Sequence, residues 1–176
     1  IYQVPVEVLS DILFGHILLN DQLFAADLNT AYYETVSGTA FGIDEPLSIY
    51  VSVNGQNVSI NGASNVTTAD VVVGTGVIHV VDGVIPPANI VTFATTNPNF
   101  SILVEALTRP DLSIDFVSVL SAPNSFTVVA PTNDAFINLL NSNPAWNTLN
   151  DIPAEVLETV LLYHVTADDN IRAEEL

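Results

Sequence analysis

The spacing of apolar and polar positions changes along the chain and predicts two kinds of segment. Residues 5–17 and 153–165 each begin with a proline and carry apolar residues at helical spacing, which predicts two helices. Residues 47–85 alternate apolar and polar side chains, with the turn pair Asn54-Gly55 between two alternating runs, which predicts a β-meander. Pro86-Pro87 ends the meander, because proline cannot donate a hydrogen bond to a strand ladder.

The segments between the meander and the second predicted helix are shorter. Residues 88–122 have helical spacing, and residues 126–130 are typical of a short buried strand. A further helix is expected after it, with Thr132 as its N-cap and Asp134 in its first turn. The asparagine-rich residues 138–150 are expected to form a loop.

The two ends of the chain are copies of one segment. Residues 4–28 and 152–176 align without a gap, with nine of 25 positions identical and a constant offset of 148 that relates His16 to His164. A period of this length is that of a domain-sized unit. Both copies become β-branched at or after the histidine, so we expect a strand after each helix. The chain is expected to begin in the middle of one unit and to end in the middle of the next.

Composition excludes several classes of protein. Twenty acidic residues face two arginines and no lysine, and a net charge of −18 excludes nucleic acid as a partner and disfavours an anionic membrane surface. The acids are spread along the chain and are expected to form a solvated surface. The absence of cysteine excludes disulfides, thiol catalysis and cysteine-based zinc sites. No apolar run reaches the roughly 18 residues that span a bilayer, so direct membrane insertion is not expected.

Three motifs carry a family resemblance. The segments are FTVVAPTNDAF at 126–136, GVIHVVDGVIPP at 76–87 and LLYHV at 161–165, and the first copy of the last is LFGHI at 13–17. They resemble the first signature box, the second signature box and the Tyr-His motif of the fasciclin (FAS1) domain family. The resemblance implies an α+β fold, a FAS1-type β-wedge or sandwich with helices packed along one side. In the family the first box precedes the second, so the elements are expected in circularly permuted order.

The order of the boxes also predicts the domain organisation. Residues 1–87 resemble the C-terminal part of one FAS1 unit, and residues 88–176 resemble the N-terminal part of the next. Together they hold about one unit, and a meander without its partner half is expected to leave strand edges exposed. Three arrangements stay open: closure within one chain as a permutant, complementation between chains, or truncation of a longer array.

The histidines are the first candidates for chemistry. His16, His79 and His164 are accompanied by no nucleophile elbow, no HExxH motif and no triad spacing. We expect buried imidazoles that bond backbone or hydroxyl groups, and no enzyme activity. The acidic turns around residues 20–21 and 168–170 lack a DxDxDG calcium loop. No metal and no cofactor are therefore expected.

The remaining candidates are interaction and structural motifs. Tyr163 belongs to the Tyr-His motif, a region that the resemblance links to integrin binding in some animal members, although the flanking residues here do not match those members. We expect Tyr163 to pack on its helix with its hydroxyl bonded, and Thr132 and Asp134 to act as a helix cap and a hydrogen-bonding pair. Three N-x-S/T sequons, at Asn57, Asn65 and Asn99, are potential glycosylation sites.

The resemblance implies a non-enzymatic module of cell adhesion or matrix interaction, outside the cell or at its surface. Its partners would be extracellular proteins or glycans, and units repeated along an array would raise the avidity of weak contacts. Two alternatives stay open. One is a self-assembling head-to-tail filament or surface-layer subunit, a homo-oligomer formed by exchange of half-domains. The other is a module that binds a glycan or small ligand.

Overall fold

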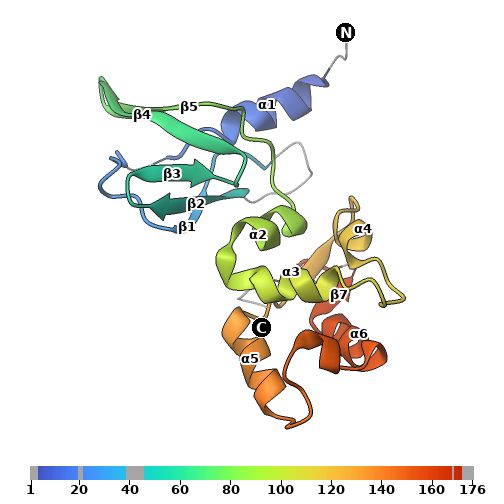
Figure 1. Ribbon diagram of the computed structural model, residues 1–176. Coiled ribbons are helices and arrows are strands. Elements are labelled where there is room, and N and C mark those ends of the chain that lie inside the picture. Colours follow the sequence, from blue (N-terminus) through green and yellow to red (C-terminus); the bar gives the residue numbers. More distant parts are fainter. Residues whose placement is uncertain (1–3, 20–21, 39–45, 168, 172–176) are drawn as a thin grey trace. The chain divides into compact units, whose positions relative to one another are not determined.

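The chain folds into two compact units, Ile1–Ala88 (unit 1) and Asn89–Leu176 (unit 2). The computed structural model describes residues 4–19, 22–38, 46–167 and 169–171 (Figure 1). Helices and antiparallel strands are both present, so the fold is α+β, as the resemblance implies. No helix in the described ranges is long and apolar enough to cross a membrane.

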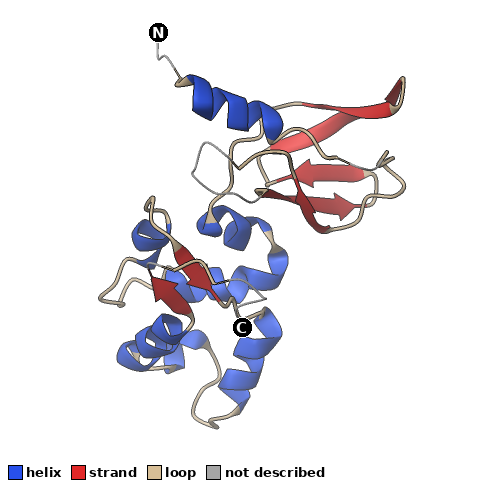
Figure 2. Ribbon diagram, turned by 180° about the vertical axis from the view of Figure 1, so that it is seen from behind, coloured by secondary structure: helices blue, strands red, loops and turns tan. Residues whose placement is uncertain are grey.

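In its described residues, unit 1 consists of helix α1 and a five-stranded antiparallel sheet (Figure 2). The strands follow one another in chain order from β1 to β5, so the meander predicted for residues 47–85 is confirmed. Strand β1 was not predicted. The elements are α1 (Val6–Phe14), β1 (Ala31–Glu34), β2 (Ser48–Asn54), β3 (Asn57–Ile60), β4 (Ser64–Val73) and β5 (Gly76–Val81).

Two glycine turns set the register of this sheet. Gly55 has a φ of +60° between paired Asn54 and Asn57, and Gly74 has a φ of +58° before the Val73–Gly76 pair. Glycine adopts this left-handed backbone without steric cost, which is why the chain reverses at these positions. The core of the unit is small. Its fully buried members are Ile49, Val51, Val58 and Ile85.

Unit 2 is mainly helical, with a short antiparallel pair of strands among the helices (Figure 2). Its elements are α2 (Ile90–Thr96), the 3₁₀ turn η2 (Pro98–Phe100), α3 (Ser101–Leu107), α4 (Phe116–Leu120), β6 (Phe126–Val128), α5 (Asn133–Asn141), the 3₁₀ turn η3 (Leu149–Asp151), α6 (Ala154–Tyr163) and β7 (Val165–Ala167). Its core is larger than that of unit 1. The buried members are Leu103, Ala106, Phe116, Phe136, Leu149, Ile152, Leu157 and Leu161.

A buried cation holds the last part of this core in place. Arg109, whose side chain is 7% exposed, donates from Nη1 to the carbonyl oxygens of Leu149 (2.7 Å) and Ile152 (2.9 Å). Its Nε and Nη2 donate to the two carboxylate oxygens of Asp111 at 2.7 and 2.6 Å. These bonds raise the pKa of Arg109 and lower that of Asp111. The guanidinium therefore fixes the chain segment that leads into α6.

Four local predictions need correction. Residues 138–150 are not one loop, because α5 continues to Asn141 and η3 forms at Leu149–Asp151. The apolar side chains at 139 and 140 pack on the core and extend the helical spacing past the first asparagine. Strand β6 ends at Val128 and is half-buried rather than buried. A strand follows the helix in the second copy only, because residues 17–19 are not in a strand. Pro5 and Pro153 stand one residue before their helices, as N-caps.

Candidate functional site

His16 joins the first copy of the Tyr-His helix to the second box. The residue follows α1, and its Nδ1 donates to the carbonyl oxygen of Ile12 at 2.7 Å. Its Nε2 then accepts the backbone N–H of Ile85 at 3.0 Å. Both ring nitrogens bond backbone groups, as expected, but the residue is exposed rather than buried. The imidazole thus connects two motifs that lie far apart in sequence.

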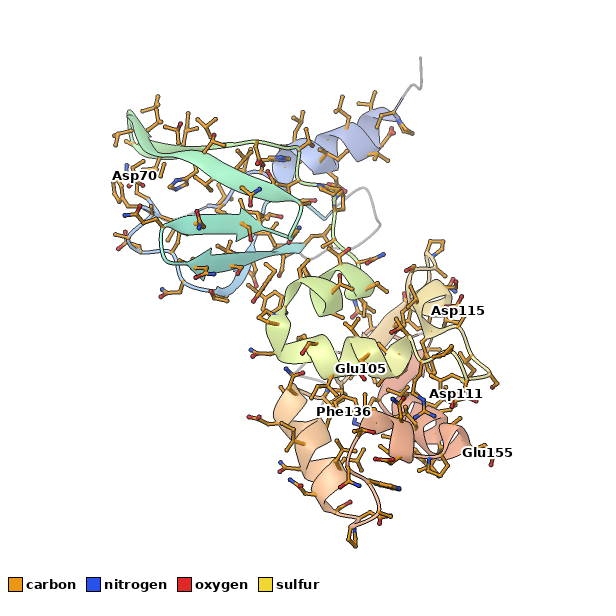
Figure 3. All side chains as sticks on the ribbon, in the orientation of Figure 1. Asp70, Glu105, Asp111, Asp115, Phe136 and Glu155 are labelled. Carbon is orange, nitrogen blue, oxygen red and sulfur yellow. The ribbon has the colours of Figure 1, made fainter. Side chains whose placement is uncertain are left out.

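His79 and Asp70 hold the chain before β1 against the β4–β5 hairpin. Nε2 of His79 donates to the carbonyl oxygen of Leu23 at 2.8 Å, and its Nδ1 accepts the N–H of Asp70 at 3.4 Å. Asp70 has a φ of +60° at an irregular position of β4, and its carboxylate accepts the N–H of Ala25 at 2.8 Å. Figure 3 shows Asp70 at this hairpin. His79 is half-buried in this arrangement.

His164 makes the same hydrogen bond from Nδ1 to its preceding helix as its counterpart His16. Its Nδ1 donates to the carbonyl oxygen of Val160 at 2.7 Å, and its own carbonyl oxygen accepts the N–H of Val129 at 2.9 Å. No described residue donates to its Nε2. The expectation that Tyr163 packs on its helix is wrong, because that side chain is 87% exposed.

The first box contains the start of α5, but the hydrogen bonds there differ from those that the sequence predicts. Thr132 stands at the N-cap position and Asp134 lies in the first turn, yet the Thr132 side chain makes no capping bond. The residue between them has the larger role. Asn133 accepts the N–H of Ile102 at 2.9 Å on Oδ1 and donates from Nδ2 to the carbonyl oxygen of Pro98, also at 2.9 Å. Asn133 therefore ties the first box to the start of α3.

A carboxylate in the second box, that of Asp82, accepts hydrogen bonds from the start of β4. Asp82 accepts the backbone N–H of Asn65 at 2.6 Å and its side-chain amide at 3.0 Å, and these bonds lower the pKa of Asp82. The next residue, Gly83, accepts the Ser64 hydroxyl on its carbonyl oxygen at 2.7 Å. The candidate residues thus fall into separate places: His16 at the second box, His79 at the hairpin, and the others at the ends of α5 and α6. Among the described residues no group of three or more His, Asp or Glu could hold a metal ion.

Comparison with known proteins identifies the family. The fasciclin domain model matches residues 4–87 and 98–176. The chain belongs to the fasciclin domain family. An uncharacterized protein of Synechocystis (sll1735) is 38% identical over 86 residues, which cover 49% of this chain and 59% of that protein. Human periostin is 28% identical over 125 residues, which cover 69% of this chain and 13% of periostin.

A solved structure shares the fasciclin fold. It is a FAS1 domain pair from the insect cell adhesion molecule fasciclin I, with a TM-score of 0.51 and 17% sequence identity. The alignment covers 94% of this chain and 58% of that one. At this identity the likeness shows the fold alone. The chain spans less than two thirds of each of these proteins.

The first Tyr-His copy of this fasciclin chain borders a small pocket in unit 1. Gly15, where the second copy has tyrosine, lines it with Asp11, Ser37, Asn61 and residues 85–88, at the end of the second box and just after it. Asn61 is 3% exposed, and its Oδ1 accepts a backbone N–H at 2.7 Å. Its Nδ2 is buried and has no hydrogen-bond partner among the described residues. Asn61 thus lines the pocket and keeps an unsatisfied buried donor, a feature that the sequence does not reveal.

The end of the β4–β5 hairpin is an exposed apolar surface. Strand β5 forms one edge of the sheet, so a row of its backbone groups is open to pairing. Valine and isoleucine side chains stand in solvent on both strands near the Gly74 turn. They are Val71 (38%), Val73 (55%), Ile78 (51%) and Val80 (45%) on one face of the hairpin and Val72 (61%) on the other, here called the hairpin patch. Exposed apolar side chains gathered in this way are typical of contact surfaces.

Proposed function

We propose that this chain is a non-enzymatic module of cell adhesion or matrix interaction that acts outside the cell or at its surface. The observation that carries the proposal is the fasciclin family match over both parts of the chain. An insect cell adhesion molecule shares the fold, which supports the same role.

The geometry of two of the three histidines, His16 and His79, supports the non-enzymatic part of the proposal. A general base needs a ring nitrogen that is free to take a proton from a substrate. In His16 and His79 one nitrogen donates to a carbonyl and the other accepts a backbone N–H, so neither ring has a nitrogen in reserve. These rings connect segments of unit 1 and are suited to structure rather than to proton transfer.

The hairpin patch is the surface that we assign to the adhesive contact. An edge strand with exposed β-branched side chains suits a protein partner, because the partner can add a strand and bury apolar side chains together. Repetition of the contact along an array would raise its avidity.

Cell attachment to surfaces coated with the purified chain tests the proposal. The double variant Val72→Thr/Ile78→Thr keeps β-branched side chains and removes apolar surface, so it should reduce attachment several-fold at equal coating density. Val84→Thr is the matched control, because Val84 is 69% exposed outside the hairpin and undergoes the same chemical change. No attachment by the parent chain would overturn the adhesive role. Equal attachment by all three proteins would overturn the hairpin assignment alone.

A glycan partner is tested in parallel. Binding of the parent chain to a glycan array, unaffected by the double variant, would replace a protein partner by a carbohydrate one. Binding to neither cells, matrix proteins nor glycans would contradict the function as a whole.

A further inference from the structure

The asparagine-glycine pair, the dipeptide most prone to lose a side-chain amide, occurs twice in the chain. Asn54-Gly55 lies at the turn between β2 and β3, and Asn61-Gly62 lies between β3 and β4. Asparagine is chemically labile, and a glycine after it favours the reaction because no side chain shields the glycine nitrogen. The chain has no cysteine and no methionine, so oxidation at sulfur does not compete with this chemistry. The two pairs share a sequence and differ in their surroundings.

The first pair is open to water. Asn54 is the last residue of β2 and is exposed, and its side chain forms no hydrogen bond to any described residue. The backbone N–H of Gly55 has no acceptor in the described part of the chain either. A Cβ built on Gly55 would meet nothing within 4 Å. The amide carbon of Asn54 and the backbone nitrogen that follows it are therefore both accessible, and no hydrogen bond restrains them.

The second pair is held inside unit 1. Asn61 is 3% exposed, and its Oδ1 accepts the backbone N–H of Tyr50 at 2.7 Å. Its own backbone N–H donates to the carbonyl oxygen of Tyr50 at 2.8 Å. These bonds fix the side chain, and burial keeps water and hydroxide away from its amide carbon. A reaction at Asn61 therefore requires that this part of the sheet opens first.

We propose that Asn54 is a site of spontaneous deamidation in the folded protein, and that burial protects Asn61 from the same reaction. The co-reactant is water, so the reaction needs no enzyme. The reactive pair lies at the turn between β2 and β3, outside the hairpin patch. The proposal therefore goes beyond the adhesive role, and either can fail without the other.

The reaction has two steps. The backbone nitrogen of Gly55 loses its proton to the solvent and forms a bond to Cγ of Asn54, while the bond from Cγ to Nδ2 breaks and the side-chain nitrogen takes up a proton and leaves as ammonia. Water then hydrolyses the cyclic imide at either of its carbonyl carbons. The products carry aspartate or isoaspartate at position 54, and each has an additional negative charge.

The isoaspartate product changes the backbone as well as the charge. Its main chain passes through the side-chain carbon atoms, which lengthens the chain at the turn. Asn54 pairs with Asn57 and Val53 pairs with Val58, a buried member of the core. The hydroxyl of Thr30 holds the same strand end, since it accepts the N–H of Val53 at 2.9 Å. A longer turn cannot keep this register and these contacts together, so isoaspartate should destabilise unit 1.

Incubation of the purified chain in mildly alkaline buffer, once folded and once in concentrated urea, tests the proposal. Ion exchange separates the acidic products, and tandem mass spectrometry assigns the mass change from amide to acid to Asn54 or Asn61. In the folded chain Asn54 should react at least about tenfold faster than Asn61, because opening of the sheet limits the buried site. In urea most of this difference should disappear, since both asparagines precede glycine.

Asn54→Gln is the matched control. It keeps a side-chain amide before Gly55, but the longer side chain forms a cyclic imide far more slowly, so the early acidic species should disappear. Persistence of that species in Asn54→Gln overturns the assignment to Asn54. Equal rates at the two sites in the folded chain, or an Asn54 that reacts only in urea, overturn the proposal as a whole.

Calorimetry separates the effect of the backbone from that of the charge. Asn54→Asp carries the additional charge on a main chain of ordinary length. The purified isoaspartyl form should therefore melt at least about 4 °C below Asn54→Asp in the transition of unit 1. Equal Tm values for the two forms would overturn the effect on the strand register.

Discussion

Replacement of Arg109 by alanine should unfold unit 2 at a much lower temperature. The guanidinium donates to the carbonyl oxygens of Leu149 and Ile152, residues that are 4% and 1% exposed, so the variant removes a charged donor from two buried acceptors. The Leu149 carbonyl keeps the N–H of Ile152 at 3.2 Å. Hydrogen bonds to a charged donor contribute about 1.5–3 kcal/mol each, which gives a loss of roughly 3–6 kcal/mol for the two bonds. For a unit of this size each kcal/mol lowers Tm by about 4–8 °C, so a fall of at least about 12 °C is expected.

The fluorescence of Trp146 is a suitable assay, because it is the only tryptophan of the chain and packs against the core of unit 2. Thermal and urea unfolding followed at this residue report unit 2 without interference from unit 1. Circular dichroism of the folded variant at low temperature checks that the fold is retained.

Two further variants separate geometry from charge. Arg109→Lys keeps the charge but lacks the planar fork, so it should recover one carbonyl bond and lose about half as much stability as alanine. Asp111→Asn leaves both carbonyl bonds in place and should lower Tm far less than Arg109→Ala. If Arg109→Ala melts within about 3 °C of the parent, or if Asp111→Asn is as damaging, the role assigned to the two carbonyl bonds is refuted.

Three other outcomes are expected. Phe136→Ala removes a ring that is 2% exposed and should cost about 3–5 kcal/mol in urea unfolding, whereas Ile137→Ala, at 46% exposure, should cost under about 1 kcal/mol; similar losses would contradict the core assignment. Gly55→Ala, at a φ of +60°, should lower stability by about 1 kcal/mol, while Gly76→Ala, which is not at a positive φ, should have little effect; equal effects in calorimetry would argue against the turn geometry. Hydrogen bonds hold the pKa of Asp82 below its ordinary value of 3.8, so its contribution to unit 1 is complete above that pH and is lost as pH falls through the lower, folded pKa. Asp82→Asn should therefore destabilise the chain at pH 7 and make little difference at pH 2, and a loss that is the same at both pH values would refute this linkage.

The meander was predictable because the turn residues and alternating runs that define it lie next to one another in the sequence. The Asn54-Gly55 pair lies at an observed turn, and the alternating runs beside it became β2 and β3. The end of the sheet before Pro86-Pro87 was predictable for the same reason, since proline acts on its own backbone. Strand β1 carried no comparable turn pair, and it is defined by its pairing with β2 across a segment of more than ten residues.

The residues that connect distant segments within unit 2 were less accessible to sequence reasoning. Asn133 and Arg109 bond backbone groups more than 30 positions away, and nothing in their immediate neighbours indicates which carbonyl or N–H they meet. The positions of Thr132 and Asp134 at a helix start were predictable, because helix starts have a recognisable local composition. The exposure of Tyr163 was missed because helical spacing describes a face of the helix but not whether that face has a partner.

The burial of Arg109 also affects how the negative charge of the surface is balanced. The chain has no lysine, and among the described residues Arg109 is the only arginine and is turned inward. The described surface therefore carries no exposed lysine or arginine charge to offset its carboxylates, and mobile counterions must do so. Two such surfaces repel each other when their separation falls within the screening length, about 8 Å at physiological ionic strength. Ionic strength should thus control how densely these chains can cover a surface. At low ionic strength their mutual repulsion reaches further, so the chains should lie further apart.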